Sequence, residues 1–139
     1  MKLKVKDIMT KSVAYVNPMS TVVETAQLMQ KHNVGSLPVL DQNGVVGIVT
    51  DRDIVVRNVA HGKDPQSTPV KDVMTSQVTK VTPDMDISEV SGLMSKEQVR
   101  RLPVVENNKL VGIVALGDMA TDSKFDTEAS DALSEISKP

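Results

Sequence analysis

The stretch with the clearest chemical potential is Gly47-Ile-Val-Thr50-Asp-Arg-Asp53, where a threonine ends a valine-rich segment and an aspartate follows three residues later. If Thr50 opens a helix, the helix N-terminus offers unpaired N–H groups and positive potential, which suit a phosphate. The Thr50 hydroxyl can bond a phosphate or sugar oxygen. The Asp53 carboxylate can accept hydrogen bonds from two vicinal hydroxyls, which is how acidic side chains bind ribose. Together these residues predict a nucleotide site.

The same residues also have a purely structural interpretation. A threonine followed three residues later by an aspartate is a capping box, in which the hydroxyl and the carboxylate satisfy backbone donors. A second copy of the stretch has Ala115 and Asp118 at these places, so the aspartate persists without the hydroxyl, which indicates a second role. An aspartate in the first turn is still worth about 0.3–1 kcal/mol against the helix dipole. Capping and ligand binding both stay open.

Two adjacent arginines form the other marked site. Arg100 and Arg101 precede a Leu-Pro-Val segment that also occurs in the first copy, where Gly35 and Ser36 stand in their place. Two neighbouring guanidinium groups can clamp a phosphate. The alternative is that both are solvated charges flanking an edge strand. Arg57, further along the helix that follows the first motif, is predicted to lie at the surface.

The composition excludes several other chemistries. The chain of 139 residues has no cysteine and only two histidines, so thiolate metal sites, cysteine nucleophiles and histidine relays have little basis. The sequence shows no nucleophile–base pair, metal-ligand cluster or Walker-type glycine-rich loop, and we predict that the protein is not an enzyme. With 16 basic and 18 acidic residues, it has no general basic field for nucleic acid.

The sequence shows neither a membrane span nor a secretory signal. No apolar stretch approaches the roughly 18–20 residues that a membrane helix needs. The N-terminal residues MKLKVKDIMT lack the apolar region of a signal peptide. We therefore expect a cytoplasmic protein that has no membrane partner.

The core must be built from aliphatic side chains. The only aromatic residues are Tyr15 and Phe125, whereas valine occurs 23 times. β-Branched side chains fit the pleated surface of a sheet, so strands are favoured. Because no aromatic stacking platform is available, a planar ligand must lie between aliphatic side chains.

A tandem duplication organises these motifs. Residues 7–54 align with residues 72–119 without a gap, and 20 of the 48 aligned positions are identical. The identities include parts of an Asp-[Ile/Val]-Met-Thr opening, a Val-x-Pro segment, Leu-Pro-Val and Gly-Ile-Val. Such agreement predicts two copies of one structural unit that share a core.

Each repeat is predicted to fold as β-α-β-β-α. The first repeat has strands at 13–16, 36–40 and 45–49, a helix capped by Thr21 and Glu24, a turn at 41–44, and a helix from 51 to near 60 closed by Gly62. The second repeat has strands at 78–81, 101–105 and 110–114 and a helix from Asp86 with Glu89.

The chain is divided by this pattern into repeat 1 at residues 5–61, a turn-rich linker at 62–71, repeat 2 at 72–120 and a tail at 121–139. The tail has no counterpart in the repeat. It is either a short helix that packs on the module or its dimer partner, or a frayed end.

The second helix of repeat 1 is unusually apolar. It carries Ile54, Val55, Val56 and Val59, which is more than a surface helix of so small a protein needs. We expect this surface to form a homodimer interface. The other repeat of the same chain is the competing destination.

With all these motifs in both halves, the repeat resembles the cystathionine-β-synthase (CBS) domain, and the pair resembles a stand-alone, bacterial-type Bateman module. The resemblance covers about residues 5–120. It implies an α/β (α+β) fold in which two repeats pack with pseudo-twofold symmetry around two clefts. It also implies a homodimer and a ligand such as AMP, ADP, ATP or another adenosyl compound.

The family pattern assigns roles to matching residues. Its threonine and aspartate, which contact phosphate or ribose and the ribose hydroxyls, match Thr50 and Asp53 in the first repeat and only Asp118 in the second. Basic residues before the Leu-Pro-Val strand of one repeat commonly reach phosphates in the cleft of the other repeat's aspartate. This pattern assigns Arg100 and Arg101 to the Asp53 cleft and implies one nucleotide per chain.

The resulting prediction is a regulatory module that senses an adenine nucleotide in a cleft between the repeats, with no obligatory cofactor and no metal. The alternative is a constitutive dimerisation or interaction scaffold whose clefts are vestigial. Because the sequence carries no recognisable effector domain, its output would pass through an unidentified protein partner or through the dimer surface.

Overall fold

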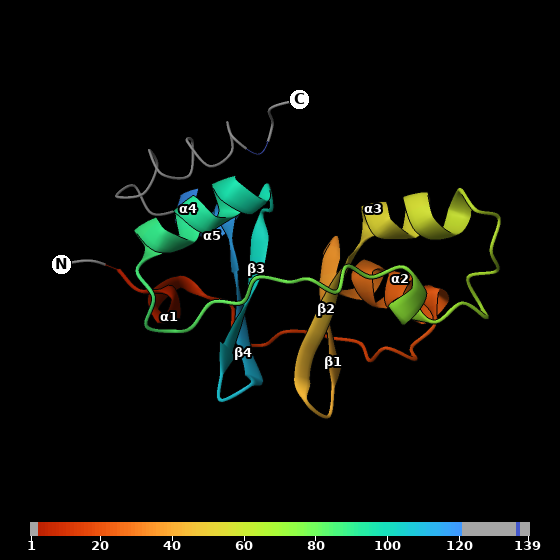
Figure 1. Cartoon of the computed structure of the whole chain (residues 1–139), viewed down its shortest axis with the longest axis horizontal. Helices are drawn as coiled ribbons and strands as arrows, with labels where there is room; N and C mark the ends of the chain where they lie inside the picture. The colour runs from red at the N-terminus through yellow and green to blue at the C-terminus, as the bar shows by residue number, and fades with distance from the viewer. Residues whose placement is uncertain (1–2, 121–135, 137–139) are drawn as a thin grey trace. The chain divides into compact units, whose positions relative to one another are not determined.

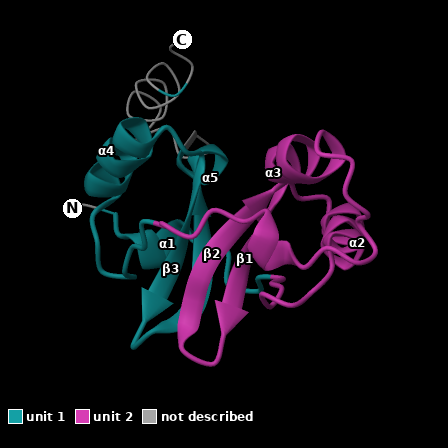
Figure 2. Cartoon of the chain, turned by 45° about the vertical axis from the view of Figure 1, so that its right-hand side comes forward, with its two compact units in different colours: residues 1–13, 79–139 teal, residues 14–78 magenta. Residues whose placement is uncertain are grey.

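Residues 3–120 and Ile136 are described by the computed structural model of the chain (Figure 1). Contacts divide the chain into two compact units, coloured separately in Figure 2. Unit 2 is residues 14–78, and unit 1 combines residues 1–13 with residues 79–139. Both units mix helices with a two-stranded antiparallel sheet, which confirms the predicted α/β (α+β) class.

Unit 2 contains the Thr50–Asp53 motif. Its elements in chain order are α2 (Val22–His32), β1 (Ser36–Asp41), β2 (Gly44–Thr50), α3 (Asp51–Ile54), the π-helix η1 (Val55–Val59) and the 3-10 helix η2 (Val70–Asp72). Its core is aliphatic, as the composition predicts, and consists of Val16, Val22, Met29, Leu37, Val39, Val49, Val70 and Val73.

Helix α2 begins where the sequence predicts. The Glu24 N–H donates to the Thr21 hydroxyl oxygen at 3.1 Å, and the Thr21 N–H donates to Glu24 Oε1 at 3.2 Å. The predicted capping box is therefore formed. The helix ends at Asn33, which adopts the left-handed conformation with φ 53°. Asparagine tolerates this conformation because its short polar side chain can bond locally.

The β1–β2 hairpin positions the motif. The strands pair antiparallel from Ser36↔Thr50 to Asp41↔Gly44, around the predicted turn. Thr50 is the last residue of β2 and Asp51 is the first residue of α3. The hairpin thus delivers the end of a strand directly to the start of a helix.

The strands predicted at 13–16 and 78–81 are reduced to single parallel bridges, Val16↔Val39 and Val81↔Val104. Proline explains this difference. The Val16 N–H donates to the Pro38 carbonyl at 3.1 Å. The next bonds of a parallel ladder would need N–H groups from Pro38 on one side and Pro18 on the other, which proline lacks. The second repeat has prolines at the equivalent places.

The predicted helix from residue 51 changes type after one turn. The Ala60 N–H donates to the Val55 carbonyl at 2.9 Å, a spacing of five residues. Val55 and Val56 are β-branched, and such side chains crowd the preceding turn of an α-helix, which the wider π-helical turn relieves. Gly62 follows with φ 66°, as its predicted place at the end of the helix requires.

Unit 1 repeats this plan. Its elements are α1 (Val5–Ile8), α4 (Ile87–Glu97), β3 (Arg101–Glu106), β4 (Lys109–Ala115) and α5 (Leu116–Ala120). The turn between β3 and β4 places both Asn107 and Asn108 at positive φ, as a tight type I′ hairpin turn requires. The core is formed by Val5, Val81, Ile87, Val90, Met94, Leu102, Val104, Val114, Leu116 and Met119.

The opening residues of repeat 1, and the equivalent residues at the end of the linker before repeat 2, each pack on the body of the other repeat. In unit 1 the Val5 N–H donates to the Met85 carbonyl at 3.0 Å, and in unit 2 the Val70 N–H donates to the Ser20 carbonyl at 2.7 Å. These four residues are equivalent in pairs, and both valines are fully buried. The compact units therefore differ in their bounds from the sequence repeats.

The predicted tail helix lies outside the described residues except for Ile136, which is partly buried against the core of unit 1. Within the part of the chain that the structure describes, no helix has the length and apolar character needed to cross a membrane.

Candidate functional site

Thr50 and Asp53 meet at the junction of β2 and α3. The Asp53 N–H donates to the Thr50 hydroxyl oxygen at 3.1 Å, and the Thr50 N–H donates to Asp53 Oδ2 at 3.0 Å. The capping interpretation of the motif is therefore confirmed. The capping box uses one carboxylate oxygen and leaves Oδ1 without a hydrogen-bond donor among the described residues.

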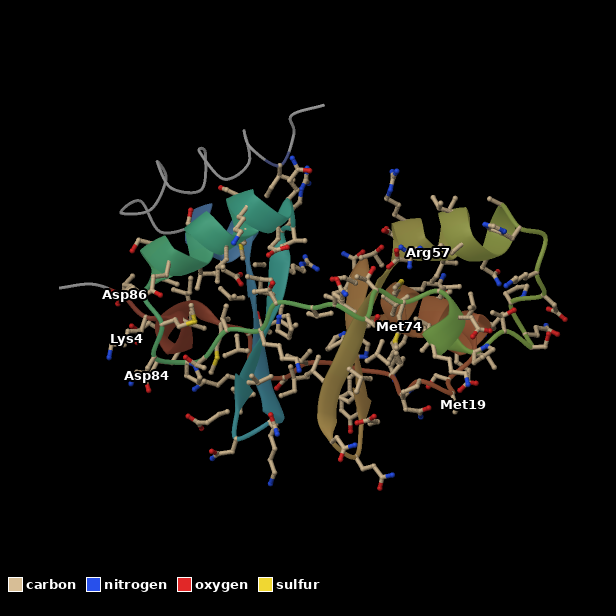
Figure 3. All side chains as sticks on the ribbon, in the orientation of Figure 1. Lys4, Met19, Arg57, Met74, Asp84 and Asp86 are labelled. Carbon is tan, nitrogen blue, oxygen red and sulfur yellow. The ribbon has the colours of Figure 1, made fainter. Side chains whose placement is uncertain are left out.

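Arg57 lies beside this second oxygen. Its Nε is 3.9 Å from Asp53 Oδ1, an ion-pair distance that is too long for a hydrogen bond. Its Nη1 donates to the carbonyls of Val73 at 3.3 Å and Met74 at 3.1 Å. Arg57 and Met74 are labelled in Figure 3. The Asp53 side chain is 14% exposed, so the carboxylate is mostly covered but still accessible.

The junction in unit 2 carries little net positive charge to hold a phosphate. Asp51 and Asp53 stand beside Arg52 and Arg57. The backbone of Gly35 lies close to Asp51. The Asp51 N–H donates to the Gly35 carbonyl at 2.9 Å, and a Cβ on Gly35 would lie 3.0 Å from Asp51 Oδ2. The arrangement suits hydroxyl groups as ligands better than a phosphate.

Asp118 occupies the equivalent junction in unit 1. The Ala115 N–H donates to Asp118 Oδ2 at 3.1 Å, so half of the capping box persists without a threonine. Asp118 therefore caps the junction without a threonine, because any residue except proline supplies that backbone donor, and a second role for Asp118 stays a prediction.

Arg100 and Arg101 lie at the start of β3. The Leu116 N–H donates to the Arg100 carbonyl at 2.8 Å, and Arg101 pairs with Ala115 in the β3–β4 ladder. Within unit 1, backbone contacts thus place both arginines at the junction that precedes Asp118. Thr50 and Asp53 belong to unit 2, and the assignment of the arginines to the Asp53 site stays a prediction.

The interactions of the Arg57 side chain were not predicted from the sequence. The side chain is 48% exposed, as a surface residue should be, yet its head group has three partners. The available signal was the spacing of four residues between Asp53 and Arg57, which places opposite charges on one helix face. The contacts to Val73 and Met74 join residues far apart in sequence, and no local pattern announces them.

Among the described residues, no three histidine, aspartate or glutamate side chains gather closely enough to hold a metal ion. The junction in unit 2 consequently offers hydrogen-bond acceptors and donors, with no cluster of metal ligands.

Comparison with known proteins identifies the repeat. The family model of the CBS domain matches residues 5–58 and 70–122, one match for each repeat. The CBS domain-containing protein YhcV of Bacillus subtilis (strain 168) is 48% identical over 133 residues, which are 96% of this chain and 94% of YhcV.

Solved structures of CBS-domain proteins are also similar to this chain. Hypoxic Response Protein I with two coordinated zinc ions is 35% identical with a TM-score of 0.80, over 86% of this chain and 98% of that one. The CBS domain pair of MJ0100 in complex with 5′-methylthioadenosine and S-adenosyl-L-methionine is 30% identical with a TM-score of 0.79, over 87% and 95%. A hexameric CBS-CP12 protein from bloom-forming cyanobacteria is 30% identical with a TM-score of 0.81, over 91% and 71%.

Proposed function

This chain belongs to the CBS domain family and carries a pair of such domains, a regulatory module, and on that premise we propose that it binds an adenine nucleotide or a related adenosyl ligand. The proposed site is the junction of β2 and α3 in unit 2. We propose that it acts in the cytoplasm by ligand binding and not by catalysis.

The observation that carries the proposal is the state of the Asp53 carboxylate. One oxygen is held by the Thr50 N–H, and the other receives no hydrogen bond from the described residues while the side chain remains 14% exposed. An accessible charged acceptor held in one orientation is what a pair of vicinal hydroxyls needs. The capping role therefore coexists with ribose binding, because the two roles use different oxygens.

The complex of MJ0100 supports the same ligand class. Both 5′-methylthioadenosine and S-adenosyl-L-methionine carry an adenosyl group with a ribose diol, and neither carries a phosphate. The ribose diol is thus one feature that these ligands share, and it is the feature that Asp53 is suited to bind.

For ligands that do carry phosphates, we propose Arg100 and Arg101 as the phosphate-binding residues of this site. Asp51 and Asp53 balance the charges of Arg52 and Arg57 around this junction, so a phosphate needs further cations from elsewhere. The support for these two arginines is the family pattern and their charge. The Asp118 junction lacks the threonine, and we propose that it stays empty.

The second candidate function is an interaction scaffold, and the exposed valines of η1 favour it. Val55, Val56 and Val59 are 58%, 45% and 62% exposed. We propose that they contribute to a homodimer interface, although the cyanobacterial CBS-CP12 relative is hexameric. A sensor can also signal to a partner through this surface. The two functions therefore differ only in whether the protein binds a ligand.

A thermal-shift screen separates sensor from scaffold. AMP, ADP, ATP, S-adenosyl-L-methionine and 5′-methylthioadenosine are each added to the full chain, with GMP as the control for the base. A ligand at a hundredfold excess over its Kd stabilises the folded state by about 2.7 kcal/mol. The sensor proposal predicts a clear rise in melting temperature with at least one adenosyl compound. No rise with any of them would favour the scaffold.

A further inference from the structure

We infer that Arg57 is a positioning residue of the Asp53 site, and that it makes this site selective for ligands with an intact ribose diol. The inference rests on the proposed function and extends it to a residue outside the motif.

The Arg57 head group is fixed although its side chain is half exposed. Its Nη1 donates to the carbonyls of Val73 and Met74 at 3.3 and 3.1 Å. Those carbonyls follow η2, in the segment of unit 2 whose Val70 N–H donates to the Ser20 carbonyl. A guanidinium is planar and rigid, so binding at one nitrogen also orients the other edge of the group.

That other edge faces Asp53. The Nε atom lies 3.9 Å from Oδ1, which is close enough for charge attraction and too far to use up the oxygen's lone pairs. Meanwhile the Thr50 N–H holds Oδ2 at 3.0 Å. The carboxylate is thus held from two sides, while Oδ1 keeps its capacity to accept a ligand hydroxyl.

Such positioning matters because two hydroxyls on adjacent ribose carbons must meet one carboxylate. A carboxylate that rotates freely would lose that freedom on binding, which lowers affinity for the diol. A group already held within a few tenths of an ångström of its bound geometry avoids this loss. Arg57 should therefore raise the preference for a ribose over a sugar without hydroxyls, more than it raises binding in general.

The second repeat provides a natural contrast. Continuing the repeat alignment places Asp122 opposite Arg57. An aspartate cannot attract the carboxylate of Asp118 or donate to backbone carbonyls. At this aligned position only repeat 1 has an arginine, a difference that is independent of Thr50 and of the arginines at 100 and 101.

The test measures the preference for AMP over 2′,3′-dideoxy-AMP by calorimetric titration of the full chain. Arg57→Gln removes the charge but keeps a polar side chain, and we expect it to lower the preference about tenfold, the equivalent of one hydrogen bond to a charged group. Arg52→Gln is the matched control, since it removes the same charge five residues earlier in the chain. The Arg52 side chain makes no hydrogen bond or ion pair among the described residues. The preference of Arg52→Gln for AMP over 2′,3′-dideoxy-AMP should therefore equal the wild-type value.

A melting-temperature loss in Arg57→Gln with an unchanged preference would overturn the inference, because it would show a structural contact only. Arg57→Lys keeps the charge but cannot fix two partners with one planar group, and an unchanged preference there would also overturn it, even if Arg57→Gln did not fold. Wild-type protein that binds no AMP would contradict the proposed function itself. Wild-type protein that binds AMP selectively, with selectivity independent of residue 57, would contradict this inference alone.

Discussion

The amide of Thr50 and the carboxylate of Asp53 are joined by a 3.0 Å hydrogen bond to Oδ2, which leaves Oδ1 of the same carboxylate to other partners. This division confirms the capping role and leaves an acceptor oxygen for the ligand binding that we propose. One aspartate can end the strand-to-helix junction and still present an acceptor, because each oxygen has its own role. The division also allows the two roles to be separated by experiment.

The threonine of the capping box should affect stability in both repeats. Thr50→Ala removes the hydroxyl that accepts from the Asp53 N–H, and loss of such a cap costs about 0.5–2 kcal/mol. Ala115→Thr supplies the missing hydroxyl in front of Asp118 and should raise stability. Urea titration of both variants checks the signs, and a stabilised Thr50→Ala would contradict the capping geometry.

Gly47 is required by close packing. A Cβ there would lie 2.7 Å from Met74 Sδ and 2.9 Å from the Thr75 carbonyl oxygen, and the backbone at residue 75 is fixed by pairing with Ile48. We expect Gly47→Ala to destabilise the protein by about 1–3 kcal/mol through overpacking.

Gly92 is the matched control, because it lies within α4 and a Cβ there meets nothing within 4 Å. Gly92→Ala should stabilise the protein by about 0.5–1 kcal/mol through helix propensity. Thermal melts of the two alanine variants should therefore move in opposite directions. Equal shifts would show that the packing at Gly47 is looser than described.

The sequence predicted those elements whose signals are local. Thr21 and Glu24 define the start of α2 because a capping box needs only three residues of separation. The repeat alignment predicted that both halves share one plan, and the hairpins follow their turn residues. The Thr50–Asp53 pair was predictable as a motif for the same reason.

The parts that the sequence did not predict depend on contacts between distant residues. The strand at 13–16 looked regular, but its extent was decided by the missing N–H groups of Pro18 and Pro38. The packing of Val5 with residues beyond 79 cannot be inferred from the repeat pattern. The pattern would be the same if the opening segment packed on its own repeat or on the other one. The role of Arg57 was missed because its carbonyl partners lie 16 and 17 residues away.

If Arg101 binds a phosphate, its removal should weaken the binding of charged ligands more than that of an uncharged one. We expect Arg101→Ala to weaken ATP and AMP binding while leaving adenosine affinity nearly unchanged, since only the nucleotides carry phosphates. Hydrogen bonds to charged groups are worth about 1.5–3 kcal/mol, so the loss should be about tenfold or more. Competition titrations with the three ligands measure it, and equal losses for all three would refute the phosphate role.

Self-association should depend on the exposed valines of η1. We expect light scattering to give a mass above the 15.0 kDa of one chain, because an apolar surface of this kind is rarely left in contact with water. Val59→Glu places a charge on a side chain that is 62% exposed, so it should weaken association without disturbing the fold. A wild-type particle of one chain's mass at micromolar concentration would contradict the homodimer.

The two aspartates should separate capping from binding. Asp53→Ala and Asp118→Ala each remove the bond from a strand-end N–H, at 3.0 and 3.1 Å, so both should lower the melting temperature. Only Asp53→Ala should lower adenine-nucleotide affinity, by about a hundredfold for two lost hydrogen bonds to a charged group. Asp118 is therefore the internal control for fold effects.

Calorimetric titration of AMP into the wild type and these two variants tests the central claim most directly. The account predicts one nucleotide per wild-type chain, the same stoichiometry and affinity for Asp118→Ala, and loss of binding for Asp53→Ala despite a folded protein. Two equivalent sites per chain would contradict the predicted inequality of the repeats. Binding lost only in Asp118→Ala would show that the nucleotide binds in unit 1, not in unit 2 as predicted. Wild-type affinity in Asp53→Ala would contradict ribose binding by Asp53.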